Sequence, residues 1–148
     1  MMKSCLGAMG VAAMATALWY AMAARPLNAQ EPVAAAPKLD PEVVARCADA
    51  CFKCAKECEN CYAHCTEHSL MGHKSHAVSM KSCIDCADFC AMCGRICARG
   101  GIMAKSAAAA CKKACDDCAA VCEKGDERMK KCAEVCKECS QACEAVAK

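Results

Sequence analysis

The sequence is poor in aromatic residues. It holds one tryptophan, two tyrosines and two phenylalanines among 148 residues. Trp19 and Tyr20 lie in an N-terminal segment that we expect to be removed, which leaves Phe52, Tyr62 and Phe89. A core filled with aromatic rings, which usually contribute large buried areas, is therefore excluded.

Neither sign of charge dominates the chain. Its 19 basic residues include Lys3 and Arg25 near the N-terminus, so from Gln30 onward the basic residues equal in number the 17 acidic ones. This balance provides neither a basic patch for nucleic acid nor an acidic tail for a cationic partner. We expect no nucleic-acid partner, and we expect the charges to lie on solvated faces of helices.

No segment alternates apolar and polar residues with the period of a strand, so we predict an all-α protein. Asp40 and Pro41 form a helix start, because aspartate is a good N-cap and proline suits the first helical position. Glycines that follow the later helical segments are typical of helix ends. The predicted helices cover residues about 41–69, 75–99, 103–124 and 127–147 of a folded domain at 40–148.

The N-terminal segment is typical of a secretory signal, because a positive residue precedes an apolar run at 6–22 and small residues follow. A signal peptide of residues 1–29, cleaved after Ala23 or Ala29, would leave residues 30–39 as a linker. We expect an exported, periplasmic protein with no membrane contact after cleavage. The alternative is an uncleaved membrane anchor, although the apolar run is slightly short for a span.

What the sequence holds in excess is cysteine. Its twenty cysteines far exceed ordinary usage, and Cys5 lies within the predicted signal peptide. In the stretch CADACFKCAKECENCYAHC they recur at alternating spacings of four and three, and the later helices repeat this pattern. The pattern is the a/d seam of a heptad with cysteine in place of leucine. Because short turns make neighbouring helices antiparallel, we predict an up-down-up-down four-helix bundle with a cysteine-lined core.

The nineteen seam cysteines exceed what packing needs, because leucine would bury more apolar area at each site. They are Cys47, Cys51, Cys54, Cys58, Cys61, Cys65, Cys83, Cys86, Cys90, Cys93, Cys97, Cys111, Cys115, Cys118, Cys122, Cys132, Cys136, Cys139 and Cys143.

A disulfide-stapled helical domain with an interaction or structural role is one alternative reading of these cysteines, since small exported domains are commonly stapled. Their odd number opposes it, and so does the need for bridges between helices at matched heights. Metallothionein-like sequestration of zinc or cadmium is another alternative. Four thiolates around a divalent ion leave a negative charge that is costly to bury, and the seams carry no Lys or Arg to balance it.

Monovalent copper suits the pattern better, because Cu(I) is a soft ion that prefers thiolate ligands. Each Cu(I) that replaces one thiol proton leaves the charge of the core unchanged, so the seams could take up many ions. Many ions in one bundle indicate storage or buffering. We expect no enzymatic activity, since a catalytic copper site would have a few mixed ligands and an open position.

Two histidines and a methionine continue the cysteine stripes. His68 lies three residues after the last cysteine of the first stripe, His76 seven before the first cysteine of the second, and Met129 three before the first cysteine of the fourth. In an antiparallel bundle these residues meet at one end, which we predict to be the entrance and exit for Cu(I). The alternative is that they are solvated residues at helix ends.

The runs CFKCAKECENC, CIDCADFCAMC, CKKACDDCAAVC and CAEVCKECSQAC together resemble those of the bacterial copper storage proteins, which are Cys-lined four-helix bundles. The resemblance covers residues 40–148. It implies clusters of Cu(I) on the nineteen thiolates, an open end with His68, His76 and Met129, and assembly into homo-oligomers. A copper chaperone or a cuproenzyme would receive the copper. The sequence lacks the twin-arginine signal of exported members, and its cysteine density is closer to that of the cytosolic branch.

Overall fold

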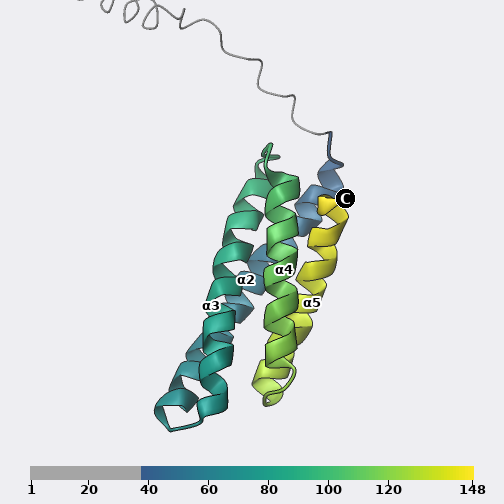
Figure 1. Ribbon diagram of the computed structural model, residues 1–148. Coiled ribbons are helices and arrows are strands. Elements are labelled where there is room, and N and C mark those ends of the chain that lie inside the picture. Colours follow the sequence, from purple (N-terminus) through teal and green to yellow (C-terminus); the bar gives the residue numbers. More distant parts are fainter. Residues whose placement is uncertain (1–37) are drawn as a thin grey trace, which may run out of the picture. The chain divides into compact units, whose positions relative to one another are not determined.

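The computed structural model describes residues 38–148, which form four α-helices and contain no strand (Figure 1). The helices are α2 (Pro41–Leu70), α3 (Lys74–Ala98), α4 (Ala104–Cys122) and α5 (Glu127–Ala147). The predicted all-α class is confirmed. The predicted signal peptide and most of the predicted linker lie outside the described residues.

Aspartates begin two of the helices. The Asp40 carboxylate accepts a hydrogen bond from the Glu42 N–H at 2.9 Å, and Pro41 occupies the first turn of α2. The Asp126 carboxylate accepts one from the Met129 N–H at 3.0 Å at the start of α5. These bonds satisfy N–H groups that have no partner within the helix. Asp40 and Asp126, the residues directly before α2 and α5, therefore fix the first turns of these helices.

The four helices pack in a ring, in which α2 contacts α3 and α5, and α4 also contacts α3 and α5. Cys47, near the start of α2, has its sulfur 3.9 Å from that of Cys97, near the end of α3. It also lies 3.8 Å from the sulfur of Cys143, near the end of α5. Cys83, early in α3, lies 3.7 Å from Cys122, the last residue of α4. The start of α2 thus lies beside the ends of α3 and α5.

Small residues allow the helices to approach closely. A Cβ atom on Gly94 of α3 would lie 2.9 Å from Cε1 of Phe52 on α2, closer than such contacts normally are. Buried alanines, among them Ala48, Ala87 and Ala119, lie beside the cysteines. Because cysteine is a short side chain, this approach is what brings sulfur atoms of different helices into contact.

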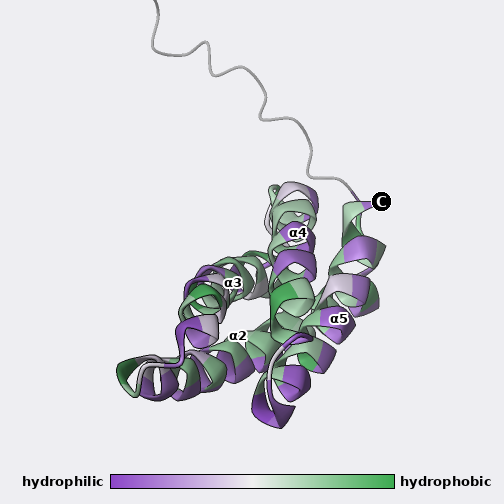
Figure 2. Ribbon diagram, turned by 60° about the horizontal axis from the view of Figure 1, so that its bottom comes forward, coloured by the Kyte–Doolittle hydropathy of each residue, from purple (hydrophilic) through white to green (hydrophobic). Residues whose placement is uncertain are grey.

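Each helix carries hydrophilic residues on one side and hydrophobic residues on another, as expected for helices around a shared core (Figure 2). Within the part of the chain that the structure describes, the buried hydrophobic residues other than cysteine and alanine are Val44, Met129, Val135 and Val146. Between residues 38 and 148, no helix has the length and apolar character needed to cross a membrane.

Candidate metal centre

The cysteines of the described chain are buried free thiols. Nineteen are present, and none has more than 2% of its surface exposed. The buried polar or charged residues of this part of the chain are Ser79 and Ser140, so no Lys, Arg, Asp or Glu is buried beside the sulfur atoms. The sulfur atoms therefore share an interior without a formal charge.

The heptad spacing explains why the sulfur atoms meet. Residues three and four apart lie on one face of a helix. Within α2 the sulfurs of Cys54 and Cys58 are 3.9 Å apart, and between α2 and α5 those of Cys58 and Cys136 are 3.6 Å apart. The shortest contact, 3.5 Å, joins Cys90 of α3 to Cys115 of α4. These are van der Waals contacts, far longer than the disulfide bond of about 2.05 Å.

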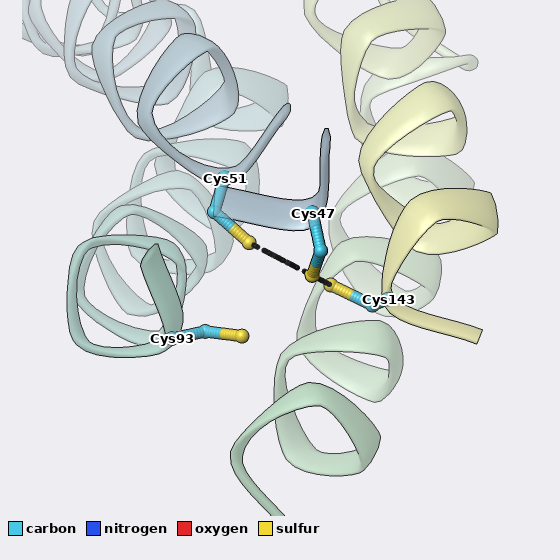
Figure 3. Close-up of side chains that lie close together, drawn as sticks. All are labelled: Cys47, Cys51, Cys93 and Cys143. Atoms are coloured by element: carbon cyan, nitrogen blue, oxygen red, sulfur yellow. Dashed lines mark hydrogen bonds between the residues drawn. The ribbon is translucent and has the colours of Figure 1, made fainter. Parts of the chain in front are cut away.

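Groups of four sulfur atoms, all within 4.8 Å of one another, recur along the bundle. One group is drawn in Figure 3, where Cys47 and Cys51 from α2, Cys93 from α3 and Cys143 from α5 point toward one another. Other groups are Cys51, Cys111, Cys139 and Cys143; Cys54, Cys86, Cys90 and Cys115; Cys54, Cys58, Cys86 and Cys136; and Cys58, Cys118, Cys132 and Cys136. Because several cysteines belong to two groups, one sulfur can bridge two neighbouring ions.

The thiols near the two ends of the sulfur array hold their protons tightly. Burial raises the pKa of Cys65 to about 12, and the neighbouring Cys61 and the Asp126 carboxylate act in the same direction. Burial also raises the pKa of Cys97. These groups are neutral thiols at physiological pH, so a bound cation must displace a proton from each thiolate it uses.

The four histidines of the chain gather near the turn between α2 and α3. The ring of His68 stacks on that of His76 with a centroid separation of 4.7 Å, and it lies 4.3 Å from the ring of His64. His73 is also close, 5.5 Å from His68. Burial and then the other imidazoles lower the pKa of His68, which favours its neutral form.

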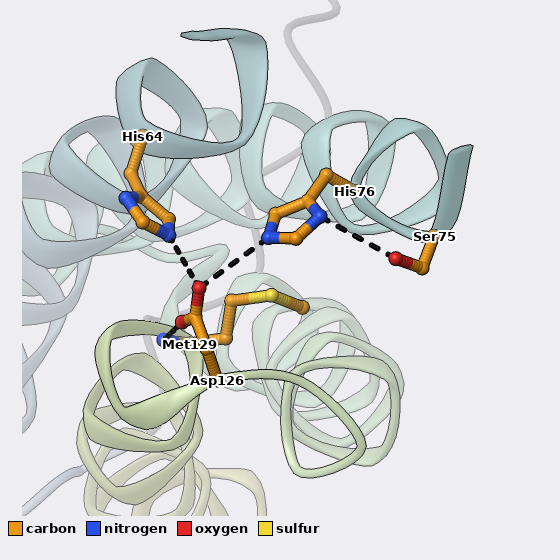
Figure 4. A network of polar contacts seen from close by, with 5 residues as sticks. All are labelled: His64, Ser75, His76, Asp126 and Met129. Carbon is orange, nitrogen blue, oxygen red and sulfur yellow. Dashed lines mark hydrogen bonds and ion pairs between the residues drawn. The ribbon is translucent and has the colours of Figure 1, made fainter. Parts of the chain in front are cut away.

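Asp126, at the start of α5, joins this histidine cluster (Figure 4). Its Oδ2 lies 2.8 Å from Nε2 of His64 and 3.4 Å from Nε2 of His76. Although partial burial acts to raise its pKa, the Met129 N–H and the two imidazoles hold it well below the usual range. One carboxylate therefore links α2 and α3 to α5.

The sequence pattern placed His68, His76 and Met129 at one end, and the structure brings them together. Met129 is 3% exposed, and its N–H bonds to the same Asp126 that contacts His76. Sequence reasoning missed the part played by His64 and Asp126. His64 lies one residue before Cys65 and so off the cysteine stripe, and the only local signal at Asp126 is that of an N-cap before α5.

The sequence model of a family described as copper storage protein matches residues 40–148. The matched range contains all four described helices and every cysteine of the sulfur groups. No curated protein matches the chain.

Proposed function

This chain belongs to the copper storage protein family, and on that premise we propose that it stores or buffers many Cu(I) ions on the thiolates of an antiparallel, cysteine-lined bundle. The observation that carries the proposal is the series of overlapping four-sulfur groups in an interior without charged residues. The up-down-up-down order is supported by the contacts of Cys47, at the start of α2, with the ends of α3 and α5.

The charge of the interior favours a monovalent ion. A Cu(I) ion that replaces one thiol proton adds no charge, whereas a divalent zinc or cadmium ion held by four thiolates leaves two negative charges in excess. Burying several such sites would be costly, because no cationic side chain lies among the sulfur atoms of the described chain. Soft sulfur ligands also prefer Cu(I).

The disulfide-stapled alternative receives no support from the sulfur geometry. The sulfur atoms contact several neighbours at similar distances. For example, the sulfur of Cys90 lies within 3.9 Å of those of Cys86, Cys111, Cys115 and Cys139. A staple needs one defined partner for each cysteine, while a ligand cluster benefits from several.

Titration of the reduced protein with Cu(I), against a strong competing chelator and without oxygen, tests storage directly. We expect a stoichiometry that approaches the number of cysteines, and a thiol count on freshly purified protein that finds them free. A capacity of only a few ions, or a protein with few free thiols, would refute storage.

We further propose that the end formed by His68, His76 and Met129 is where Cu(I) enters and leaves. Imidazole and thioether groups can bind Cu(I) and pass it to thiolates. The triple variant His68→Ala, His76→Ala, Met129→Ala should load Cu(I) more slowly at an unchanged final capacity. The matched control is Val44→Ala and Val146→Ala at the opposite end, which should load at the wild-type rate. Equal rates in all three proteins would exclude this entrance.

Export to the periplasm, homo-oligomer formation and transfer of copper to a chaperone or cuproenzyme belong to the same proposal. Export is supported by the signal-like composition of residues 1–29. Intact-mass measurement on protein from fractionated cells tests it, because cleavage removes residues 1–23 or 1–29. The uncleaved mass in a membrane fraction would instead support an anchor.

A further inference from the structure

Three potential metal ligands, from two helices and from the residue that caps a third, converge at the histidine-rich end. They are Nε2 of His64 on α2, Nε2 of His76 on α3 and Oδ2 of Asp126 before α5. Both imidazoles direct the same ring nitrogen to the same carboxylate oxygen (Figure 4). These ligands are nitrogen and oxygen, unlike the sulfur ligands of the interior.

We propose that His64, His76 and Asp126 bind one divalent transition-metal cation of intermediate hardness, such as Zn(II), Co(II) or Ni(II), at a site distinct from the thiolates. Two imidazoles and a carboxylate are a recurrent ligand set for such ions, with remaining positions open to water or substrate. The inference concerns a different ion and uses none of the storage thiolates. It shares only His76 with the proposed Cu(I) entrance, so it does not rest on storage.

The distances from the carboxylate oxygen to the two imidazole nitrogens suit a shared ion. Bonds of about 2.0–2.1 Å to nitrogen and oxygen place neighbouring ligand atoms of a tetrahedral centre roughly 3.3 Å apart. The observed separations from Asp126 Oδ2 are 2.8 Å to His64 and 3.4 Å to His76. An ion would thus replace the two hydrogen bonds that the imidazoles share on this carboxylate oxygen.

The surroundings hold the ligands in place. Asp126 Oδ1 is occupied by the Met129 N–H at 3.0 Å, which leaves Oδ2 directed at the imidazoles. The second ring nitrogen of His76, Nδ1, lies 3.4 Å from the Ser75 hydroxyl, a contact of the kind that orients metal-binding histidines. The side chains of His64 and His76 are 22% and 12% exposed, so solvent and ions can reach them from outside.

An ion at this site would tie the α2–α3 turn region to the start of α5. The site lies beside Met129, whose side chain appears with the two histidines in Figure 4. Metal occupancy should therefore stabilise the folded bundle, because a ligand that binds only the folded state raises its stability.

The test uses the full-length protein loaded with Cu(I) under anaerobic conditions, with copper content measured first. Co(II) is then added, and binding is followed by the paramagnetic shifts of the histidine ring protons in NMR spectra. We expect one Co(II) per chain, displaced by Zn(II), without the sulfur-to-cobalt charge-transfer absorption of a thiolate site. Zn(II) should also raise the thermal unfolding temperature.

The double variant His64→Gln, His76→Gln should lose these shifts and the stabilisation by Zn(II). Asp126→Asn should weaken Co(II) binding at least about tenfold, while asparagine retains the helix cap. Asp88→Asn, which removes the same charge from an exposed position on α3, is the control and should bind as the wild type does. Helical circular dichroism and Cu(I) content verify that each variant folds.

Two results would overturn the site: no histidine shifts in the wild type at saturating Co(II), or equal Co(II) binding in the double variant. A low Cu(I) content would instead count against storage. The two proposals are distinguishable because the histidine signals report Co(II) whatever the thiols hold.

Discussion

At the scale of single residues, cysteine serves here both as packing material and as the proposed ligand. The sulfur contacts of 3.5–4.0 Å are ordinary packing distances, so the helices meet without an ion between them. A thiol is small and weakly polar, and it behaves as a buried hydrophobic group. The same atom becomes a strong ligand for a soft cation once its proton is displaced.

Cys90→Ser separates these two roles. Serine is nearly the same size, but its buried hydroxyl would face sulfur atoms, which accept hydrogen bonds poorly. We expect a loss of about 1–3 kcal/mol in the free energy of unfolding together with a reduced Cu(I) capacity. The control Ala87→Ser also buries a hydroxyl but removes no thiol, so it should lose stability and retain capacity. Urea unfolding and chelator-competed titration measure the two effects, and full capacity in Cys90→Ser would contradict its role as a ligand.

At the scale of the helices, α2 is the longest of those between residues 38 and 148, at 30 residues, and Asp40 caps its first turn. Asp40→Ala removes the acceptor for the Glu42 N–H and should destabilise the protein by about 1 kcal/mol. Asp40→Asn keeps an acceptor in the same position and should remain within a few tenths of a kcal/mol of the wild type. Urea unfolding at neutral pH measures both variants. Equal losses would show that charge, and not the cap, matters at this position.

The contact between α2 and α3 depends on the absence of a side chain at Gly94. Gly94→Ala gains about 1 kcal/mol of helix propensity, but its methyl group would press on the Phe52 ring and cost about 1–3 kcal/mol. We therefore expect no gain or a net loss in the wild-type background. In a Phe52→Ala background the same change should stabilise the protein. Urea unfolding of the four proteins in this double-mutant cycle measures the difference. If Gly94→Ala changes the free energy of unfolding equally in both backgrounds, the contact between Gly94 and Phe52 does not limit the approach of the helices.

The helices could be predicted because their signals are local. The alternating spacing of the cysteines, Asp40-Pro41 and the glycines each act within a few residues, and the all-α class followed from them. The family could also be recognised from the four cysteine runs, and the family match confirms it.

The groups of four sulfur atoms could not be predicted, because they depend on the axial register between helices. Periodicity indicates that Cys58 and Cys136 face inward, but not that their sulfurs lie 3.6 Å apart. For the same reason, the sequence could not predict the contact between His64 and Asp126, which are 62 residues apart in the chain. His64 is off the cysteine stripe and comes within reach of Asp126 only when α2, α3 and α5 pack together.

At the scale of the whole bundle, the buried thiols couple stability to pH. Burial raises the pKa of Cys65 from 9.0 to about 12 and raises that of Cys97 as well. Their contribution is fully present below pH 9, because both folded and unfolded chains then keep the protons. As the pH rises from 9 toward 12 the unfolded chain loses these protons first, and stability falls by about 1.4 kcal/mol per pH unit for each such thiol.

Urea unfolding of the reduced, copper-free protein should thus show a much lower midpoint at pH 10 than at pH 7. The Cu(I)-loaded protein should change far less, because its thiolates have already lost their protons. Equal midpoints at both pH values in the copper-free protein would contradict the retention of protons by Cys65 and Cys97.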